Sequence, residues 1–220
     1  RWEDLRREPF RLFFPLGVVL GCLGVGHWLV YAIGWRNSYS GFYHASIQVG
    51  AYMSCFIVGF LLTALPRFSA TAPASSLELA IALGLMAAQV AGLWMGQWLV
   101  AEGCLVGLLV LLAVFAGRRF TKKRASVSPP TEFVWLPIAL ALGLVGTGLL
   151  MLAQAGGAPA WLMGVARSMA QQGFLLGTVL GVAGFMAPRL MGRDVLLVTP
   201  GGTSPEGALT IRRRRIRLHG

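Results

Sequence analysis

Six polar side chains inside otherwise apolar stretches are the residues of this chain most able to do chemistry. They are His27, His44, Gln48, Glu102, Arg167 and Gln171. The spacing of four between His44 and Gln48, and again between Arg167 and Gln171, would place each pair on one face of a helix. Polar groups at membrane depth are costly, which makes them candidates for a functional site. Each also has a plain structural explanation as an interfacial residue that hydrogen-bonds water.

The chemistry open to these residues is ligand or metal binding. His27 and His44 are enough for axial ligation of a haem iron, whereas a self-contained metal site needs more ligands. Arg167 fits either an interfacial anchor or the partner of an anionic group such as a haem propionate. Gln48 and Gln171 are candidate contacts of the same ligand. The sequence holds no Ser/His/Asp set, phosphate loop or paired carboxylates, so hydrolytic or kinase chemistry of the soluble type has no support, and enzymatic activity stays an open question.

Six apolar segments must position these residues. They run over residues 12–34, 43–65, 77–95, 98–116, 133–153 and 165–187. Each is close to the ~20 residues with which a helix crosses a ~30 Å hydrocarbon core, and none shows the period-two alternation of a membrane strand. The chain has 56% hydrophobic and 12% charged residues and a mean hydropathy of +0.69. We therefore predict an all-α integral membrane protein of about six transmembrane helices, surrounded by a lipid bilayer.

The net charge of +11 has a topological explanation. Of the 19 Lys and Arg residues, 17 fall before the first segment or after the second, fourth and sixth, and only Arg36 and Arg167 fall on the other side. By the positive-inside rule this predicts an N-in/C-in, multi-pass protein, which we place in a bacterial cytoplasmic (inner) membrane. The basic residues are not interleaved with aromatic ones, so nucleic-acid binding is not expected.

The chain divides into a transmembrane domain, residues 1–192, and a basic tail, residues 193–220. The tail is rich in Pro and Gly and carries an arginine run at 212–215. It is too polar to cross a bilayer, and we predict a flexible cytoplasmic segment. Because the chain begins with Arg1 rather than Met, we expect the native protein to be longer than the numbered sequence.

Small residues predict how the helices pack. Glycines recur at four-residue spacing on four of the segments, which lets helix backbones approach each other in lipid. They are Gly17 and Gly21, Gly92 and Gly96, Gly103 and Gly107, and Gly173, Gly177 and Gly181. The three cysteines, Cys22, Cys55 and Cys104, lack Cys-x-x-Cys spacing and are interpreted as small packing residues.

Three stretches of sequence carry a family resemblance. Residues 9–14 read P-F-R-L-F-F, residues 59–66 read G-F-L-L-T-A-L-P, and residues 172–192 end in P-R-L-M-G. In this order they resemble the NnrS family, membrane proteins associated with haem and copper and with denitrification and nitric oxide tolerance. The resemblance implies the helical membrane fold and a haem or copper cofactor. Family members usually have twice as many helices, so it also implies that the chain continues beyond Gly220 or is a half-length relative.

One part of the family pattern is incomplete in this chain. Residues 42–45, F-Y-H-A, stand where the family carries W-H-A-H-E-M, and only His44 remains of its H-x-H-E ligands. Ser46 and Ile47 stand where the second histidine and the glutamate would be. The resemblance therefore leaves haem as the first candidate cofactor, with His27 and His44 as candidate ligands, and leaves copper with an incomplete ligand pattern.

Three functions are consistent with the sequence. The first is an NnrS-like, haem-binding membrane protein linked to nitric oxide, nitrosative stress or respiratory metabolism. The second is a non-catalytic structural subunit that has lost its ligands and docks against a larger membrane complex, with other membrane subunits as partners. The third is half of a membrane transporter whose substrate enters from the outer side. A visible spectrum separates the first function from the other two, because haem absorbs strongly and the others require no chromophore.

Overall fold

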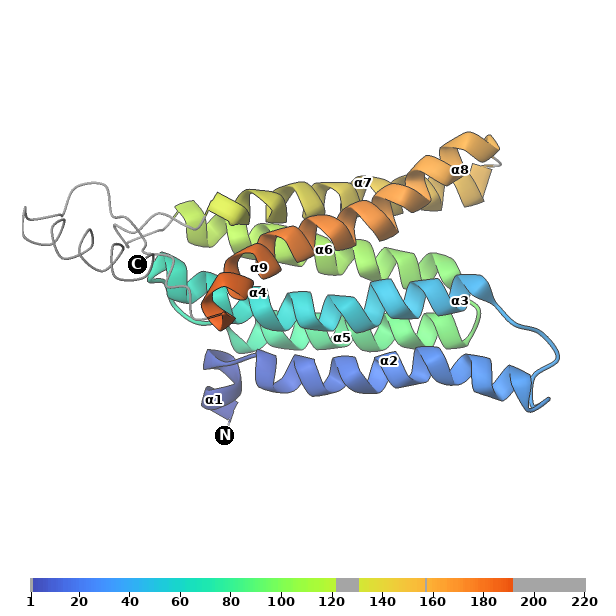
Figure 1. Cartoon of the computed structure of the whole chain (residues 1–220), viewed down its shortest axis with the longest axis horizontal. Coiled ribbons are helices and arrows are strands. Elements are labelled where there is room, and N and C mark those ends of the chain that lie inside the picture. Colours follow the sequence, from blue (N-terminus) through green and yellow to red (C-terminus); the bar gives the residue numbers. More distant parts are fainter. Residues whose placement is uncertain (1, 122–130, 157, 192–220) are drawn as a thin grey trace, which may run out of the picture.

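The described residues form helices and no strand. In the computed structural model these are residues 2–121, 131–156 and 158–191, and the predicted tail 193–220 lies outside them. Within them, six helical spans are long and apolar enough to cross a membrane. The spans run along the long axis in Figure 1, and the short helix α1 (Trp2–Arg7) stands across it. The predicted all-α, multi-pass membrane fold is confirmed.

Three of these spans are single helices and three are composite. The single helices are α2 (Phe10–Ala32), α5 (Ser76–Trp94) and α6 (Trp98–Thr121). The second span joins α3 (Gly41–Ala45), the π-helical η1 (Ser46–Met53) and α4 (Ser54–Ser69). The fifth joins the 3₁₀ turn η2 (Thr131–Val134) to α7 (Trp135–Gly156). The sixth joins α8 (Ala160–Arg167), the π-helical η3 (Ser168–Gly173) and α9 (Phe174–Leu190).

The two ends of the bundle differ in their side chains. One end, the aromatic end, carries Trp28, Trp35, Trp94, Trp98 and Trp161 in or beside its helix termini. The other, the arginine end, carries Arg7, Arg11, Arg67, Arg118 and Arg119. Because basic residues beside membrane spans favour the cytoplasmic side, the arginine end is the one predicted to face the cytoplasm.

Two span boundaries differ from the predicted ones by five residues, and the others differ by four or fewer. The sixth span begins at Ala160 rather than near residue 165, because Pro159 is its N-cap with an extended ψ of 149° and a helix can start directly after it. The fourth span continues to Thr121 rather than ending near residue 116. Its last turns are held by Arg119, whose Nη1 lies 3.2 Å from Glu78 Oε1 of α5. A basic residue that finds a buried partner can extend a helix beyond its apolar stretch.

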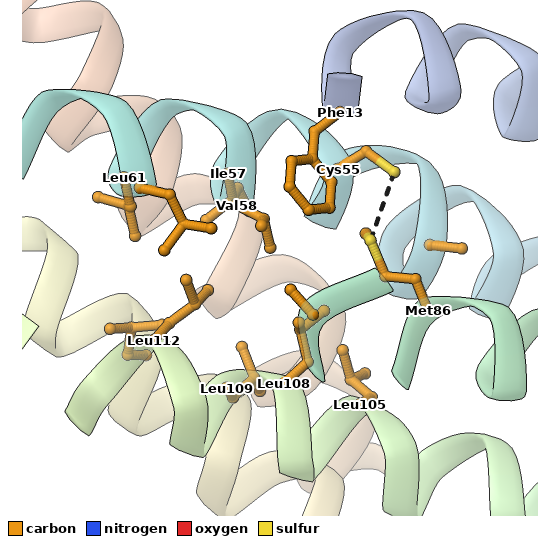
Figure 2. Close-up of a cluster of buried hydrophobic side chains, with 14 of the residues drawn as sticks. Phe13, Cys55, Ile57, Val58, Leu61, Met86, Leu105, Leu108, Leu109 and Leu112 are labelled. Atoms are coloured by element: carbon orange, nitrogen blue, oxygen red, sulfur yellow. Dashed lines mark hydrogen bonds between the residues drawn. The ribbon is translucent and has the colours of Figure 1, made fainter. Parts of the chain in front are cut away.

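The second span forms the centre of the core. Figure 2 shows side chains of α4 facing those of α5 and α6, and the buried residues it labels include Cys55, Ile57, Val58, Leu61, Met86, Leu105, Leu108, Leu109 and Leu112. Cys55 Sγ lies 3.8 Å from Met86 Sδ, in agreement with a packing role for this cysteine. Since lipid is as apolar as these side chains, close contact rather than the hydrophobic effect holds the helices together.

Glycines on the sixth span bring it against the fifth. A Cβ added at Gly177 would lie 2.9 Å from Cβ of Ala139, and one added at Gly181 would lie 2.9 Å from Cδ2 of Leu136. Gly173 meets the same helix one turn earlier. A larger side chain at Gly177 would have to displace α7, because its neighbours are Cβ and Cα of Ala139, whereas at Gly181 and Gly173 a leucine side chain would have to move. The predicted packing role of this glycine stripe is confirmed.

The other predicted glycine pairs divide into packing residues and residues with a different role. Close approach to a neighbouring helix is also found at Gly17, Gly21, Gly92 and Gly107. The prediction for Gly96 was wrong, because it lies in the α5–α6 turn with φ +71°, a backbone conformation that glycine adopts without strain. Gly103 meets only the tip of Met151, 3.9 Å away, so no close helix contact requires it.

The first two spans and the last two are repeats of one another. Shifting residues 15–67 by 122 positions aligns them with residues 137–189 without a gap. Identical pairs include Pro15/Pro137, Gly21/Gly143, Gly24/Gly146, Gly26/Gly148, Gly34/Gly156, Ser46/Ser168, Gly59/Gly181, Pro66/Pro188 and Arg67/Arg189. The π-helical turns begin at the aligned residues Ser46 and Ser168. The repeat is therefore one of conformation as well as of sequence.

The same helix contact is built in both repeats. Gly24 of α2 faces Gln48 of η1, and its counterpart Gly146 of α7 faces Ala170 of η3, which is the residue aligned with Gln48. The α5–α6 hairpin joins the two repeats, because α6 contacts both α4 and α7. The bundle thus consists of two hairpins of one design connected through α6.

Reporter fusions test the predicted orientation. Ser38, in the turn after α2 at the aromatic end, should report an external location, and Thr71, in the turn after α4 at the arginine end, an internal one. Alkaline phosphatase and fluorescent-protein fusions measure the two locations with opposite responses. The reverse pattern would overturn the N-in/C-in orientation, and the same location for both sites would contradict the six-span topology.

The substitution Gly177→Leu should destabilise the bundle by about 1–3 kcal/mol, because an over-packed side chain must push α9 and α7 apart. Gly148→Leu is the matched control, since no atom lies within 4 Å of a Cβ built at that helical glycine. Thermal unfolding in detergent compares the two variants. Equal melting temperatures would show that Gly177 does not mediate the contact between α9 and α7.

Candidate functional site at the aromatic end

His27 holds the turn between α2 and α3. Its side chain is buried near the end of α2, and its Nε2 accepts a hydrogen bond from the backbone N–H of Ser40 at 3.1 Å. Ser40 also caps α3, because its Oγ accepts the N–H of Tyr43 at 3.1 Å. The rings of Tyr39 and Tyr43 pack on the imidazole with centroid distances of 5.3 and 4.7 Å. One imidazole nitrogen of His27 is therefore already used within the fold.

His44 is fixed in a way that leaves its other nitrogen available. Its Nδ1 lies 3.1 Å from the carbonyl oxygen of Gly24. Because a carbonyl oxygen only accepts, Nδ1 carries the hydrogen, and in a neutral imidazole Nε2 is then the acceptor. Among the described residues, none hydrogen-bonds to Nε2. Metal-bound histidines commonly have this arrangement, in which a carbonyl sets the tautomer and the ring orientation.

Aromatic rings surround His44 on the side of the turn. Trp28 and Tyr39 stack with centroids 4.0 Å apart and an interplanar angle of 32°. The His44 ring lies 6.0 Å from Trp28, edge to face, and 6.4 Å from Tyr39. Trp28 is 49% exposed, so these rings form an apolar surface that is open on one side. A flat, apolar ligand could lie against such a surface.

Gln48 makes a second connection of the same kind, one turn further along η1. Its Nε2 donates to the carbonyl oxygen of Gly21 at 3.1 Å. Gly21 and Gly24 make this approach feasible, since a Cβ at either position would collide with the second span. His44 and Gln48 therefore each donate one side-chain hydrogen bond to a glycine carbonyl of α2, and the Gln48 amide keeps Oε1 and its second N–H to contact a ligand.

The structure does not gather all six predicted residues into one site. Arg167 is exposed at the end of α8, and Gln171 lies in η3, on elements that pack mainly against α7. No hydrogen bond, ion pair or ring contact joins either residue to His27 or His44. Glu102 is buried and receives a hydrogen bond from Ser46, and no ion pair joins it to Arg167. The first hairpin thus holds His27, His44 and Gln48, while the other three residues lie elsewhere.

Comparison of the two repeats shows which residues the hairpin fold requires and which occur only in the first hairpin. Leu149, Ala166 and Ala170 stand at the positions aligned with His27, His44 and Gln48. The second hairpin keeps the glycines and the π-helical turn with these apolar residues in place. Because the same design forms without the polar residues, His27, His44 and Gln48 are not needed to make a hairpin of this kind. They are candidates for a specific role of the first hairpin.

Among the residues that the structure describes, no three His, Cys, Asp or Glu side chains form a group that could hold a metal ion. A metal at His44 would therefore have to bring further ligands with it. Two parts of this site, Ser40 and the Gly24 carbonyl, were not among the predicted residues. Ser40 had a signal, since serine before an apolar helix is a common N-cap. The Gly24 carbonyl had no such signal in the sequence, because every residue has a backbone carbonyl group.

Comparison with known proteins identifies the family. A family model described as NnrS protein matches residues 4–211, nearly the whole chain. The chain belongs to the NnrS family. No curated protein and no solved structure matches it. The resemblance inferred from residues 9–14, 59–66 and 172–192 is confirmed, and the NnrS match covers both hairpins of the repeat as well as the α5–α6 hairpin.

Hydrogen exchange tests the role of His27 in this site. His27→Leu, which installs the residue type of the aligned position 149, should speed amide exchange of Ser40 by lowering its opening free energy by about 0.5–1.5 kcal/mol. His44→Ala is the control, because it keeps the His27–Ser40 hydrogen bond. Mass spectrometry measures the deuterium uptake of the peptide over residues 38–41 in both variants. Unchanged exchange in His27→Leu would mean that other contacts hold this turn.

Proposed function

We propose that this NnrS-family protein binds haem through His44 in a bacterial cytoplasmic membrane and acts in nitric oxide, nitrosative-stress or respiratory metabolism. The observation that carries the proposal is the hydrogen bond from His44 Nδ1 to the Gly24 carbonyl. An imidazole held in this way directs its Nε2 lone pair outward, and the carbonyl makes that nitrogen a better ligand. Family membership supports the metabolic context.

The donor set fits a haem iron better than a bare copper ion. A haem brings its own ring nitrogens, so a single protein imidazole is enough to hold the iron. Copper would need several protein ligands, and the described residues offer no group of three. A haem held by the His44 imidazole would supply an iron that could bind a small diatomic molecule.

The residues of the chain have different parts in this proposal. His27 holds the turn that carries Tyr39 beside His44, since its Nε2 is already an acceptor for Ser40. Gln48 fixes η1 on α2, which keeps His44 in register with Gly24. Arg167 and Gln171 are proposed as contacts from the sixth span. Arg167 is exposed and forms no ion pair with a described residue, so its guanidinium is available to a propionate.

A visible absorption spectrum of the purified protein tests the proposal. The wild-type protein, expressed with sufficient haem, should show a Soret band, and His44→Ala should remove or strongly shift it because an axial imidazole sets the field at the iron. His27→Ala should keep the band with a smaller shift, since it disturbs only the turn. Arg167→Ala should reduce haem retention without changing the axial ligand. Equal loss in His27→Ala and His44→Ala would instead support ligation by both histidines.

A colourless wild-type protein that also fails to take up added haem would overturn this function. The result would leave the other two functions that the sequence allows. Stoichiometric co-purification with other membrane proteins would then support a docking subunit, whose ligands have been lost. A protein that is colourless and purifies alone would leave half of a transporter to be tested by uptake assays.

A further inference from the structure

A second polar group lies in the interior of the bundle. Glu102 of α6 is 6% exposed, Gln89 of α5 is 2% exposed, and Ser46 at the start of η1 is also buried. We name these three residues the Glu102 layer. Ser46 Oγ donates to Glu102 Oε1 at 3.3 Å. Glu102 forms no ion pair with any described residue, although it lies in a membrane-spanning helix.

Helix register places the three side chains within one turn of each other. Gly92 of α5 faces Ala101 of α6, and Gly107 faces Leu85, so the antiparallel pairing puts Gln89 level with residues 103–104. A Cβ built at Gly50 of η1 would collide with Gln89 Nε2 and lie 3.5 Å from Leu105. Ser46 precedes Gly50 by one turn, just as Glu102 precedes Leu105. Gln89 therefore lies within about one helical turn of the Ser46–Glu102 hydrogen bond.

No positive charge faces this layer from the packed elements. α7 carries no charged or titratable side chain. The charged residue of α5 is Glu78, which pairs with Arg119 seventeen positions beyond Glu102 on α6. The titratable residues of α3, η1 and α4 are Tyr43, His44, Tyr52, Cys55 and Arg67. Of these, the cationic Arg67 lies at the arginine end and pairs with Glu8. An ionised Glu102 would therefore be stabilised mainly by one hydroxyl group.

Glu102 lacks a cationic partner and Gln89 Oε1 lacks a hydrogen-bond donor among the described residues, and one proton on Glu102 could satisfy both groups. A carboxylate at this depth with a single neutral partner has a high free energy, which binding of a proton relieves. Gln89 Oε1 is buried and has no hydrogen-bond donor in the part of the chain that the structure describes, and a buried acceptor without a donor is also destabilising. A protonated Glu102 would still accept from Ser46 through one oxygen and could donate from the other to Gln89. One proton thus satisfies both groups.

We propose that Glu102 is a reversible proton-binding site, with its carboxyl group protonated at rest and with Ser46 and Gln89 as its hydrogen-bond partners. Uptake adds one proton to the carboxylate and release returns it, with no other bond made or broken. Glu102 is one turn from Trp98, the first residue of α6, so the proton exchanges with the aromatic end of the bundle. The proposal does not depend on haem binding at His44. The adjoining π-helical turn η1 agrees with a functional position, since such turns are frequent at functional sites.

Infrared spectroscopy in an ester-free detergent tests the proposal. At neutral pH the wild-type protein should show the carbonyl stretch of a protonated carboxylic acid, which shifts in D₂O and is lost on titration to alkaline pH. Glu102→Gln should remove this band. Glu3→Gln is the matched control, because Glu3 is exposed on α1 and pairs with Arg6, and it should leave the band unchanged. A spectrum of Glu102→Gln identical to that of the wild type would overturn the proposal.

Two variants that keep Glu102 make the test independent of misfolding in Glu102→Gln. Ser46→Ala removes the hydrogen bond to the carbonyl oxygen and should raise the stretching frequency. Gln89→Leu removes the acceptor of the acid proton and should also shift the band. Shifts in both variants support the assignment to this layer, and an unmoved band in both would place the protonated acid elsewhere and overturn it.

Sodium is the other monovalent cation that a carboxylate and two neutral oxygens could hold. The spectrum is therefore repeated with sodium chloride and with choline chloride at equal ionic strength. An identical acid band in the two salts supports a proton site. Loss of the band in sodium alone would show that sodium displaces the proton, and the proposal of a proton site would be replaced by one of a sodium site.

Discussion

Close approach of α2 to the second span is the contact on which the candidate site depends. Apolar side chains gain little from each other in lipid, so helices there associate through tight packing and interhelical hydrogen bonds. Gly21 and Gly24 provide both, since the absence of a Cβ brings their carbonyl oxygens within reach of Gln48 and His44. The same hydrogen bond that fastens the hairpin also fixes the tautomer of His44. A change that weakens this helix contact should therefore also change the orientation and tautomer of the His44 ring.

The internal repeat shows which part of this arrangement is general. In the second hairpin Gly146 meets η3 as Gly24 meets η1, but Ala166 and Ala170 replace the two hydrogen-bonding side chains. Two spans are thus joined around a π-helical turn there by close glycine contacts and apolar packing, without these side-chain hydrogen bonds. The first hairpin adds polar groups to a frame that does not need them, at the free-energy cost of placing imidazole and amide groups at membrane depth. Such additions are expected where a protein has a specific function.

Two polar side chains of different chemistry lie at and just before the start of the first π-helical turn. On one side of the chain, at position 44, an imidazole with an available lone pair lies under the aromatic rings of the α2–α3 turn. At position 46, the start of η1, a hydroxyl group bonds a buried carboxyl group of α6. The proposed haem ligand and the hydroxyl partner of the proposed proton site are therefore only two positions apart in the sequence. Since α6 also contacts α7, the carboxyl group belongs to the helix that connects the two hairpins.

The six spans, the helical membrane class and the NnrS family could be predicted from the order of the residues alone. Crossing a bilayer depends on local length and hydropathy, which are properties of consecutive residues. Which polar residues meet was decided by tertiary structure, because it depends on the rotation of each helix and on contacts between distant segments. His27 and His44 were recognisable as candidates, but Ser40 and the Gly24 carbonyl, which give them different roles, lie in other elements. The separation of Arg167 from these histidines had the same cause, since equal depth along two helices does not make their side chains neighbours.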